Sequence, residues 1–195
     1  VEYYLSNPNL EINKLVNLTS INIRNSLTSD EIIKLKKHLE KQSLRDYLLI
    51  EILLNTGIRI SELLSLKQNN IQKNKIIIDK KISFNNKERQ IDISSSLYEK
   101  ILSLKNEFNQ TLFQNKKNNQ ITQRRFEQIC VKIGLELGIK LTPIILRNTA
   151  IYNLSKENVD VQLVCGLNSN TFYTHGIISA TKVSSKIIKK KELVS

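Results

Sequence analysis

The sequence predicts a mainly α-helical domain with one small antiparallel β-sheet, which is an α+β fold. Apolar residues recur at helical spacing through most of the chain from residue 27 to residue 165. The period changes at two short runs rich in isoleucine, 75–79 and 89–93, which a polar loop separates and which are typical of a hairpin. Because strands do not alternate with helices along the chain, a parallel α/β fold does not fit.

The first predicted helix begins at a capping box. Thr28 is followed three residues later by Glu31, and apolar residues then recur at helical spacing. A second helix is predicted from Leu44 to Asn55, and its apolar residues cover most of the circumference, which indicates burial. Residues 1–26 are polar and rich in asparagine, and we interpret them as an arm or as the end of a missing domain.

Two apolar helical runs meet at Gly57, which fits the left-handed position just past a helix end. The next helix starts near Ile60, so Arg59 lies in or before its first turn. That end of a helix carries partial positive charge and disfavours a cation unless an anion is nearby. Two anions could fill this need: the Glu62 carboxylate, three residues further on, or a bound phosphate.

Helical spacing returns after the hairpin. One helix is predicted from Ser96 to Phe108 and another from Ile121 to Leu137, on either side of a break at 114–120. The break consists of lysine, asparagine and glutamine, and we interpret it as a mobile loop. A short apolar helix at 161–165 is predicted to end at Gly166.

The pair Thr142 and Pro143 reads as a helix N-cap followed by proline at the first helical position. The helix that follows carries Arg147 inside an apolar face. An arginine placed in this way needs a carboxylate, backbone carbonyls or a ligand phosphate to satisfy its five N–H donors. Arg147 is therefore a second candidate for binding an anion.

The charge of the chain favours a polyanionic partner. There are 30 Lys and Arg residues against 18 Asp and Glu residues, which gives a net charge of +12. The alternative is that AT-rich coding alone has enriched lysine.

The two cysteines, Cys130 and Cys165, have no spacing typical of a metal site or of a disulfide framework, so a reduced, cytoplasmic protein without a metal is expected. Neither a membrane span nor a signal-peptide pattern is evident in the sequence.

Several blocks, taken in order, resemble the catalytic domain of the tyrosine recombinases, the phage integrase family with its Xer-like members. They are TGIRISELL at 56–64, the hairpin at 75–93, TPIILRNT at 142–149, Gly166, and YTH at 173–175. The resemblance covers roughly residue 26 to the C-terminus. It implies a DNA-binding protein of site-specific recombination or DNA integration, which cleaves and rejoins strands through a 3′-phosphotyrosine link without metal or cofactor.

The resemblance also implies roles for individual residues. Arg59 and Arg147 would be the two arginines that hold the reacting phosphate, because guanidinium groups match its nonbridging oxygens. Tyr173 would be the nucleophile. The expected catalytic set is thus Arg59, Arg147 and Tyr173, and the expected DNA-binding set is Arg59, Lys87, Arg89 and Arg147.

Three positions depart from the family pattern. Where the family has a lysine and two further hydrogen-bonding residues, this chain has Phe84, Ile144 and Leu167. Lys87 or Lys81 could substitute for the lysine if the hairpin turn has a different shape. Two expectations follow. The chain is either a recombinase with weakened cleavage, or a degenerate recombinase-fold protein that binds DNA or a partner recombinase without cutting.

The expected domain organisation follows from the same resemblance. Residues 1–26 form an N-terminal arm or the remnant of a DNA-clamping domain, residues 27–176 the catalytic domain, and residues 177–195 a basic tail. The expected partner is double-stranded DNA, with a second copy of the chain or a partner recombinase on the same DNA. No small-molecule substrate is expected.

Overall fold

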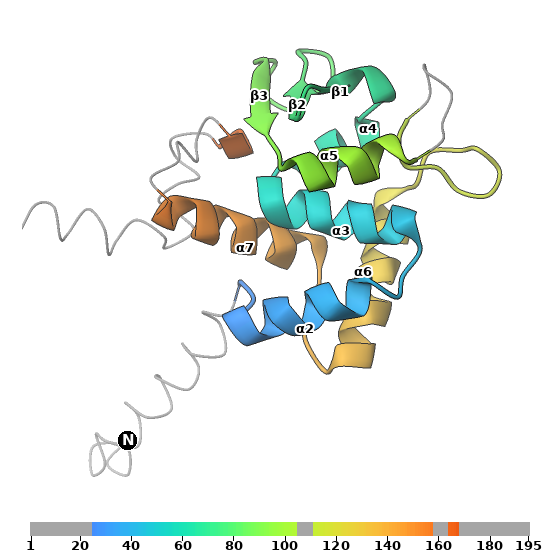
Figure 1. Cartoon of the computed structure of the whole chain (residues 1–195), viewed down its shortest axis with the longest axis vertical. Helices are drawn as coiled ribbons and strands as arrows, with labels where there is room; N and C mark the ends of the chain where they lie inside the picture. Colours follow the sequence, from blue (N-terminus) through green and yellow to red (C-terminus); the bar gives the residue numbers. More distant parts are fainter. Residues whose placement is uncertain (1–24, 105–110, 158–163, 168–195) are drawn as a thin grey trace, which may run out of the picture.

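The computed structural model describes residues 25–104, 111–157 and 164–167. Its elements, labelled as in Figure 1, follow one another along the chain. They are α2 (Ser29–Leu39), α3 (Leu44–Thr56), α4 (Ile60–Ser65), a 3-10 turn η2 (Gln68–Asn70), β1 (Ile71–Gln72), β2 (Lys75–Ile78), β3 (Arg89–Asp92), α5 (Ser95–Leu102), α6 (Gln123–Leu137) and α7 (Pro143–Lys156). The predicted class, mainly helical with a small antiparallel sheet, is confirmed.

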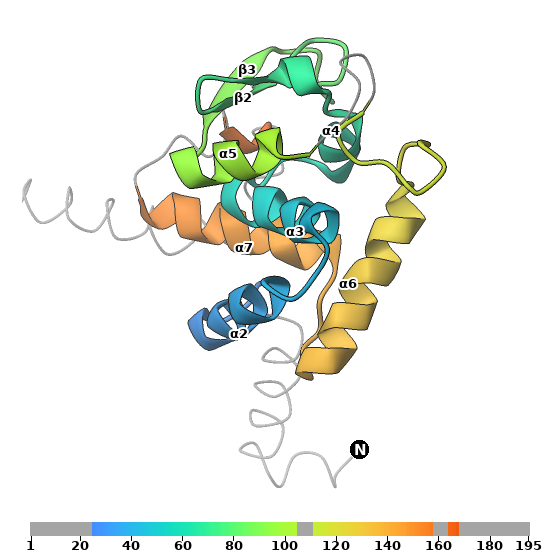
Figure 2. The same ribbon diagram turned by 45° about the vertical axis from the view of Figure 1, so that its right-hand side comes forward.

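Helices α3 and α7 lie side by side at the centre of the molecule, with α2 and α6 on one side of them and α4, α5 and the sheet on the other (Figure 1). The same order is seen after rotation in Figure 2. The side chains of Leu48, Ile52 and Leu53 on α3 are fully buried, as the sequence predicts for a helix apolar on most sides. The α3–α7 pair is therefore the centre of the core, and the elements that carry the candidate site are attached to it.

The sheet has three strands in the order β1-β2-β3, all antiparallel. The predicted hairpin is confirmed: Ile76 pairs with Ile91, and Ile78 pairs with Arg89. The short strand β1 was not predicted, since it is only two residues long. It joins β2 through Lys73 and Asn74, whose φ angles of 46° and 63° form a tight left-handed turn.

The predicted helix ends are also present. In the capping box, the Thr28 backbone N–H donates to Glu31 at 2.8 Å, and the Glu31 N–H donates to the Thr28 hydroxyl at 3.2 Å. Gly57 ends α3 with a φ of 59°. At the start of α7 the Thr142 hydroxyl accepts from the Ile145 N–H at 3.2 Å.

Two segments show details that the sequence did not predict. The segment at 114–120 has a defined conformation, because the Asn115 side chain accepts from the backbone N–H groups of Lys117 and Asn119 at 2.8 and 3.1 Å. The side chain of Gln120 then anchors it by donating to the Leu64 carbonyl at 2.8 Å. Helix α5 ends at Leu102 instead of continuing to residue 108, and residues 105–110 lie outside the described part of the chain.

Among the helices of the described ranges, none has both the length and the apolar composition that crossing a membrane requires.

Candidate anion-binding site

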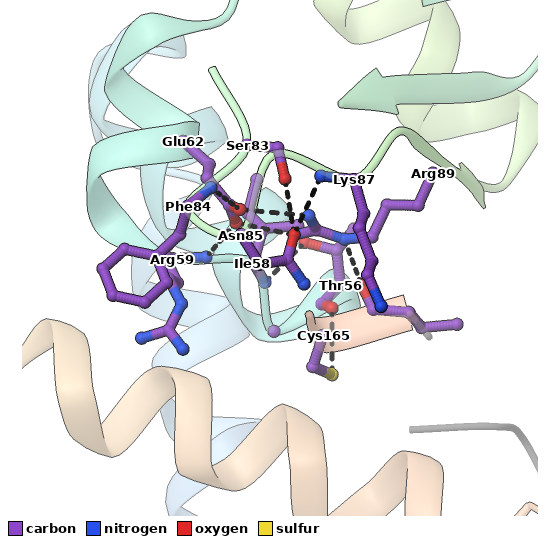
Figure 3. Close-up of polar contacts among 12 residues, drawn as sticks. Thr56, Ile58, Arg59, Glu62, Ser83, Phe84, Asn85, Lys87, Arg89 and Cys165 are labelled. Atoms are coloured by element: carbon purple, nitrogen blue, oxygen red, sulfur yellow. Dashed lines mark hydrogen bonds and ion pairs between the residues drawn. The ribbon is translucent and has the colours of Figure 1, made fainter. Parts of the chain in front are cut away.

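Arg59 is the N-cap of α4 and lies two residues after Gly57, which has a left-handed conformation. Its guanidinium lies over the ring of Phe84, with the Cζ atom 3.9 Å from the ring centroid (Figure 3). Its Nε atom is buried and has no hydrogen-bond partner among the residues that the structure describes. The side chain is thus a half-buried cation whose guanidinium has an aromatic neighbour but no anion beside it in the described ranges.

Glu62 does not form the i, i+3 ion pair with Arg59 that the sequence allows. The Glu62 carboxylate, 1% exposed, accepts from both terminal nitrogens of Arg89 at 3.0 and 2.6 Å. It also accepts from the backbone N–H groups of Arg59 at 2.8 Å and Phe84 at 3.2 Å (Figure 3). Of the two anions considered for Arg59, the carboxylate is therefore already used by another arginine.

These contacts set the ionisation of Glu62. Burial raises the pKa of this carboxyl, but the hydrogen bonds and charge of Arg89, with the N–H groups of Arg59 and Phe84, outweigh burial and lower the pKa below its ordinary 4.5. Glu62 is therefore ionised at neutral pH and neutralises Arg89. The charge of Arg59 is left for another partner.

Arg147 on α7 is only 7% exposed. It donates through Nη1 to the carbonyl of Gly57 and through Nη2 to the carbonyl of Cys165, the second at 3.0 Å. Burial, with a smaller contribution from the nearby charge of Arg59, lowers the pKa of Arg147 to about 10, so the guanidinium stays protonated at neutral pH. Carbonyls thus satisfy part of its donor capacity, and two of its five N–H donors are used in this way.

Arg59 and Arg147 line the same pocket, which has a volume of about 480 Å³. The pocket lies where the α3–α4 junction meets α6 and α7. Its other lining residues are mostly apolar: Leu53, Ile60, Gln123, Glu127, Val131, Thr142, Pro143 and Ile144. Two guanidinium groups at one pocket can bind an anion through charge-assisted hydrogen bonds.

The three positions that depart from the family pattern lie in different surroundings. Phe84 stacks on Arg59, as described above, and Ile144 is 56% exposed at the lining of the pocket. Leu167 is 8% exposed and packs with Ile151 and Cys165 in a small apolar cluster. At two of these positions a side chain without a proton to transfer is therefore beside the arginines, and the third is part of the core.

Of the other predicted site residues, Lys81, Lys87 and Arg89 do not line the pocket. Lys81 and Lys87 are exposed on the loop between β2 and β3. Arg89 is buried, with a side chain 3% exposed and held by Glu62, which leaves no access for a DNA backbone. The predicted nucleophile, Tyr173, lies outside the described residues.

Arg89 has a structural role that was not predicted from the sequence. Its Nε donates to the Val164 carbonyl at 3.0 Å, while its guanidinium binds Glu62. Gly166, with a φ of 60°, lies so close that an added Cβ would be 3.0 Å from the Arg89 Cζ atom. The alternation of buried and exposed residues along β3 could have indicated this role. Arg89 lies two residues before the buried Ile91, so both side chains face the core.

Solved structures with a similar fold include site-specific recombinases. The crystal structure of XerA recombinase matches with a TM-score of 0.64 at 20% identity, covering 85% of this chain and 62% of that one. The XerH site-specific recombinase, bound to its difH substrate in a pre-cleavage complex, matches with a TM-score of 0.67 at 22% identity, covering 84% of this chain and 52% of that one. The fold is that of the tyrosine recombinase catalytic domains.

The sequence profile of the phage integrase family matches residues 25–168, and the chain belongs to this family. It is 27% identical over 171 residues to the tyrosine recombinase XerA of Pyrococcus furiosus, covering 85% of this chain and 58% of that protein. It is 28% identical over 165 residues to the tyrosine recombinase XerH of Campylobacter jejuni, covering 77% of this chain and 47% of that protein. The chain thus spans roughly half of the length of these curated relatives.

Proposed function

We propose that this chain binds duplex DNA through the Arg59–Arg147 pocket and serves in site-specific strand cleavage and rejoining. The observation that carries the proposal is that two arginines line one pocket while Glu62, the carboxylate nearest in sequence to Arg59, is occupied by Arg89. The charge of Arg59 is therefore available for an anion, and for a member of this family that anion would be a DNA phosphate. The net charge of +12 supports a polyanionic ligand.

In the proposed reaction the hydroxyl oxygen of Tyr173 attacks the phosphorus of one phosphodiester. The bond to the 5′ oxygen breaks, and the 3′ end of the cut strand remains bonded to the tyrosine. Negative charge grows on the nonbridging oxygens in the transition state, and Arg59 and Arg147 would stabilise it with N–H donors that are already in position. Rejoining is the same displacement in reverse, with a 5′ hydroxyl as the attacking group.

Proton transfer is the step for which this chain lacks the residues of the family pattern. The phenol of Tyr173 must lose a proton, and the departing 5′ oxygen must gain one. Phe84, Ile144 and Leu167 cannot exchange protons, and the loss of one acid–base group typically slows a reaction by about 10²- to 10⁴-fold. Lys81 and Lys87, on the loop that carries Phe84, are the nearest lysines in sequence that could donate a proton after a movement of that loop.

A second candidate function is DNA binding without cleavage. The apolar Ile144 at the pocket lining and the buried Leu167 both favour it, since each replaces a hydrogen-bonding residue of the family pattern. A protein of this kind would hold DNA through phosphate contacts with modest preference for sequence, or would bind a partner recombinase, without cutting.

We also propose the assembly in which the site would work. The XerH structures contain its difH substrate, and a lambda integrase dimer bound to a core site matches with a TM-score of 0.61 at 19% identity. By analogy, this chain would act on double-stranded DNA in the cytoplasm with a second copy or a partner recombinase. Residues 27–176 would form the catalytic domain, preceded by an arm at 1–26 and followed by a basic tail at 177–195. The proposed DNA contacts are Arg59, Arg147 and Lys87.

Covalent trapping separates the two functions. The protein is incubated with nicked duplexes of randomised sequence, in which the strand end diffuses away after cleavage, and products stable in denaturing detergent are isolated. A recombinase gives a protein–DNA adduct that is absent for Tyr173→Phe. Salt-dependent binding without any adduct would establish the second function. No DNA binding even at low salt would exclude both cleavage and DNA binding without cleavage.

A further inference from the structure

The ring of Phe84 covers one face of the Arg59 guanidinium at 3.9 Å. Phe84 does not line the pocket that Arg59 shares with Arg147, so the ring backs the guanidinium from outside that pocket. Although it makes this contact, Phe84 is 61% exposed. A side chain with that exposure adds little to the core, and the contact recorded for its ring among the described residues is the one with Arg59.

The turn that carries Phe84 is held by its own hydrogen bonds. One carboxylate oxygen of Asp79 accepts from the backbone N–H groups of Lys81 at 2.8 Å and Ile82 at 3.2 Å. The hydroxyl of Ser83 then donates to the Asn85 side chain at 2.7 Å. The ring is therefore presented by a turn that is ordered before any ligand arrives.

A single carboxylate also fixes the ring relative to the arginine. Glu62 accepts from the backbone N–H groups of both Phe84 and Arg59, and it is itself bound to Arg89. The backbones on both sides of the stacked pair thus share one buried anchor (Figure 3).

Within the described residues, the ring is the neighbour that restrains the Arg59 guanidinium. The Nε atom has no hydrogen-bond partner there, and Glu62 contacts the backbone of Arg59 but not its side chain. A free arginine side chain has several rotatable bonds, and ordering it on binding costs conformational entropy. A ring on one face removes much of that freedom in advance and leaves the N–H edge open.

We propose that Phe84 is a positioning residue of the phosphate site. It holds the Arg59 guanidinium in place at the pocket that Arg59 shares with Arg147, with N–H groups available to a DNA phosphate. This inference rests on the proposed function, in which Arg59 binds that phosphate. Phe84 takes the place of the lysine of the family pattern, and it acts through Arg59 without touching the reacting atoms.

The test is a double-substitution cycle on affinity for a fluorescently labelled duplex at fixed low salt. Phe84→Leu keeps an apolar side chain but removes the ring, and it should weaken binding by about threefold to tenfold, as expected for a cation–π contact that is partly shielded from water. Phe84→Tyr should restore binding to within about twofold of wild type. In an Arg59→Gln background, Phe84→Leu should have no further effect, because the residue through which it acts is gone.

Tyr152→Leu is the matched control. Tyr152 on α7 stacks with Lys156 at 4.1 Å, and neither residue lines the pocket. This substitution removes the same kind of aromatic–cation pair elsewhere on the surface. Its DNA affinity should equal that of wild type.

A spectroscopic signal adds an independent measurement. The chain contains no tryptophan, so Phe84→Trp introduces a unique fluorophore against the Arg59 guanidinium. DNA should change its emission, and Arg59→Gln should abolish that change. A merely structural role of position 84 would leave the emission insensitive to DNA.

The outcomes distinguish the inference from the function on which it rests. If Arg59→Gln weakens binding but Phe84→Leu does not, the positioning role is refuted and the phosphate site stands. An effect of Phe84→Leu that persists in the Arg59→Gln background refutes it as well. If Arg59→Gln itself binds DNA like wild type, the proposed phosphate site fails and the inference fails with it.

Discussion

Glu62 determines how the charges of the site are shared. Its carboxylate binds the two terminal nitrogens of Arg89 and the backbone N–H groups of Arg59 and Phe84, at 1% exposure. Because the negative charge of this group is used by Arg89, the charge of Arg59 remains available for a ligand. The same bonds join α4, β3 and the loop before β3, so this residue also contributes to stability.

Glu62→Gln should lower the free energy of unfolding by about 3 kcal/mol, because removing one partner of a buried ion pair leaves the other charge uncompensated. Urea denaturation measures the loss. The control is Glu99→Gln on the exposed side of α5, which should change stability by no more than about 0.5 kcal/mol. Equal stability of the two variants would contradict the role given to Glu62.

Glu62 should also make stability depend on pH. Its pKa is lower in the folded protein than the ordinary 4.5, so the folded state favours the ionised form. The resulting stabilisation is complete above pH 4.5 and is lost as the pH falls below that value toward the folded pKa. Unfolding curves from pH 7 to pH 3 should therefore show the gap between wild type and Glu62→Gln narrowing at the acid end. A gap that stays constant would argue against this ionisation.

At the scale of the elements, the junction between α3 and α4 positions both arginines. Gly57 adopts a φ of 59°, which turns the chain so that Arg59 follows directly as the N-cap of α4. The Gly57 carbonyl accepts from Arg147, and a Cβ at Gly57 would be 2.9 Å from the Cys165 sulfur. The junction, α7 and the turn at 164–166 thus meet at a point with no room for a side chain.

Gly57→Ala should therefore be destabilising for two reasons, backbone strain and a clash. Gly138 provides the matched control, since its φ is 66° but an added Cβ would have no atom within 4 Å. Gly138→Ala should cost about 1 kcal/mol from strain alone, and Gly57→Ala about 1–3 kcal/mol more from overpacking. Thermal unfolding compares them. Equal losses would mean that the close approach at Gly57 is not structurally important.

The features that could be predicted from sequence are those that local physics decides. The capping box at Thr28, the left-handed turn at Gly57 and the cap at Thr142 each depend on neighbours within four residues, and all are present. The partner of Glu62 could not be foreseen in this way, because Arg89 is 27 residues away and meets it only through the packing of β3 against α4. The role of Tyr173 stays a prediction.

The stacking of Phe84 on Arg59 shows the same limit. The sequence marked both positions, one as a match to the family and the other as a departure from it. Their contact depends on the conformation of the loop between β2 and β3, which includes Asn86 with a φ of 54°. The position of this loop also depends on the hydrogen bond from the Phe84 backbone N–H to Glu62, 22 residues away, which local patterns do not predict.

At the scale of the whole molecule, the net charge of +12 and the arginine pocket point to one polyanionic ligand. A basic surface alone would give binding that many lysines share about equally. A pocket with two arginines gives binding in which particular residues matter far more than others of the same charge. The central claim is that Arg59 and Arg147 hold a DNA phosphate.

The most direct test compares duplex DNA affinity, as a function of salt, for wild type, Arg59→Gln and Lys37→Gln. Lys37, exposed on α2, supplies the same loss of charge away from the pocket. We predict that Arg59→Gln weakens binding by about tenfold to a hundredfold, as for the loss of a charge-assisted hydrogen bond, and lowers the salt slope by about 0.9. Lys37→Gln should stay within about twofold of wild type. Equal affinities and salt slopes for the two variants would contradict the claim.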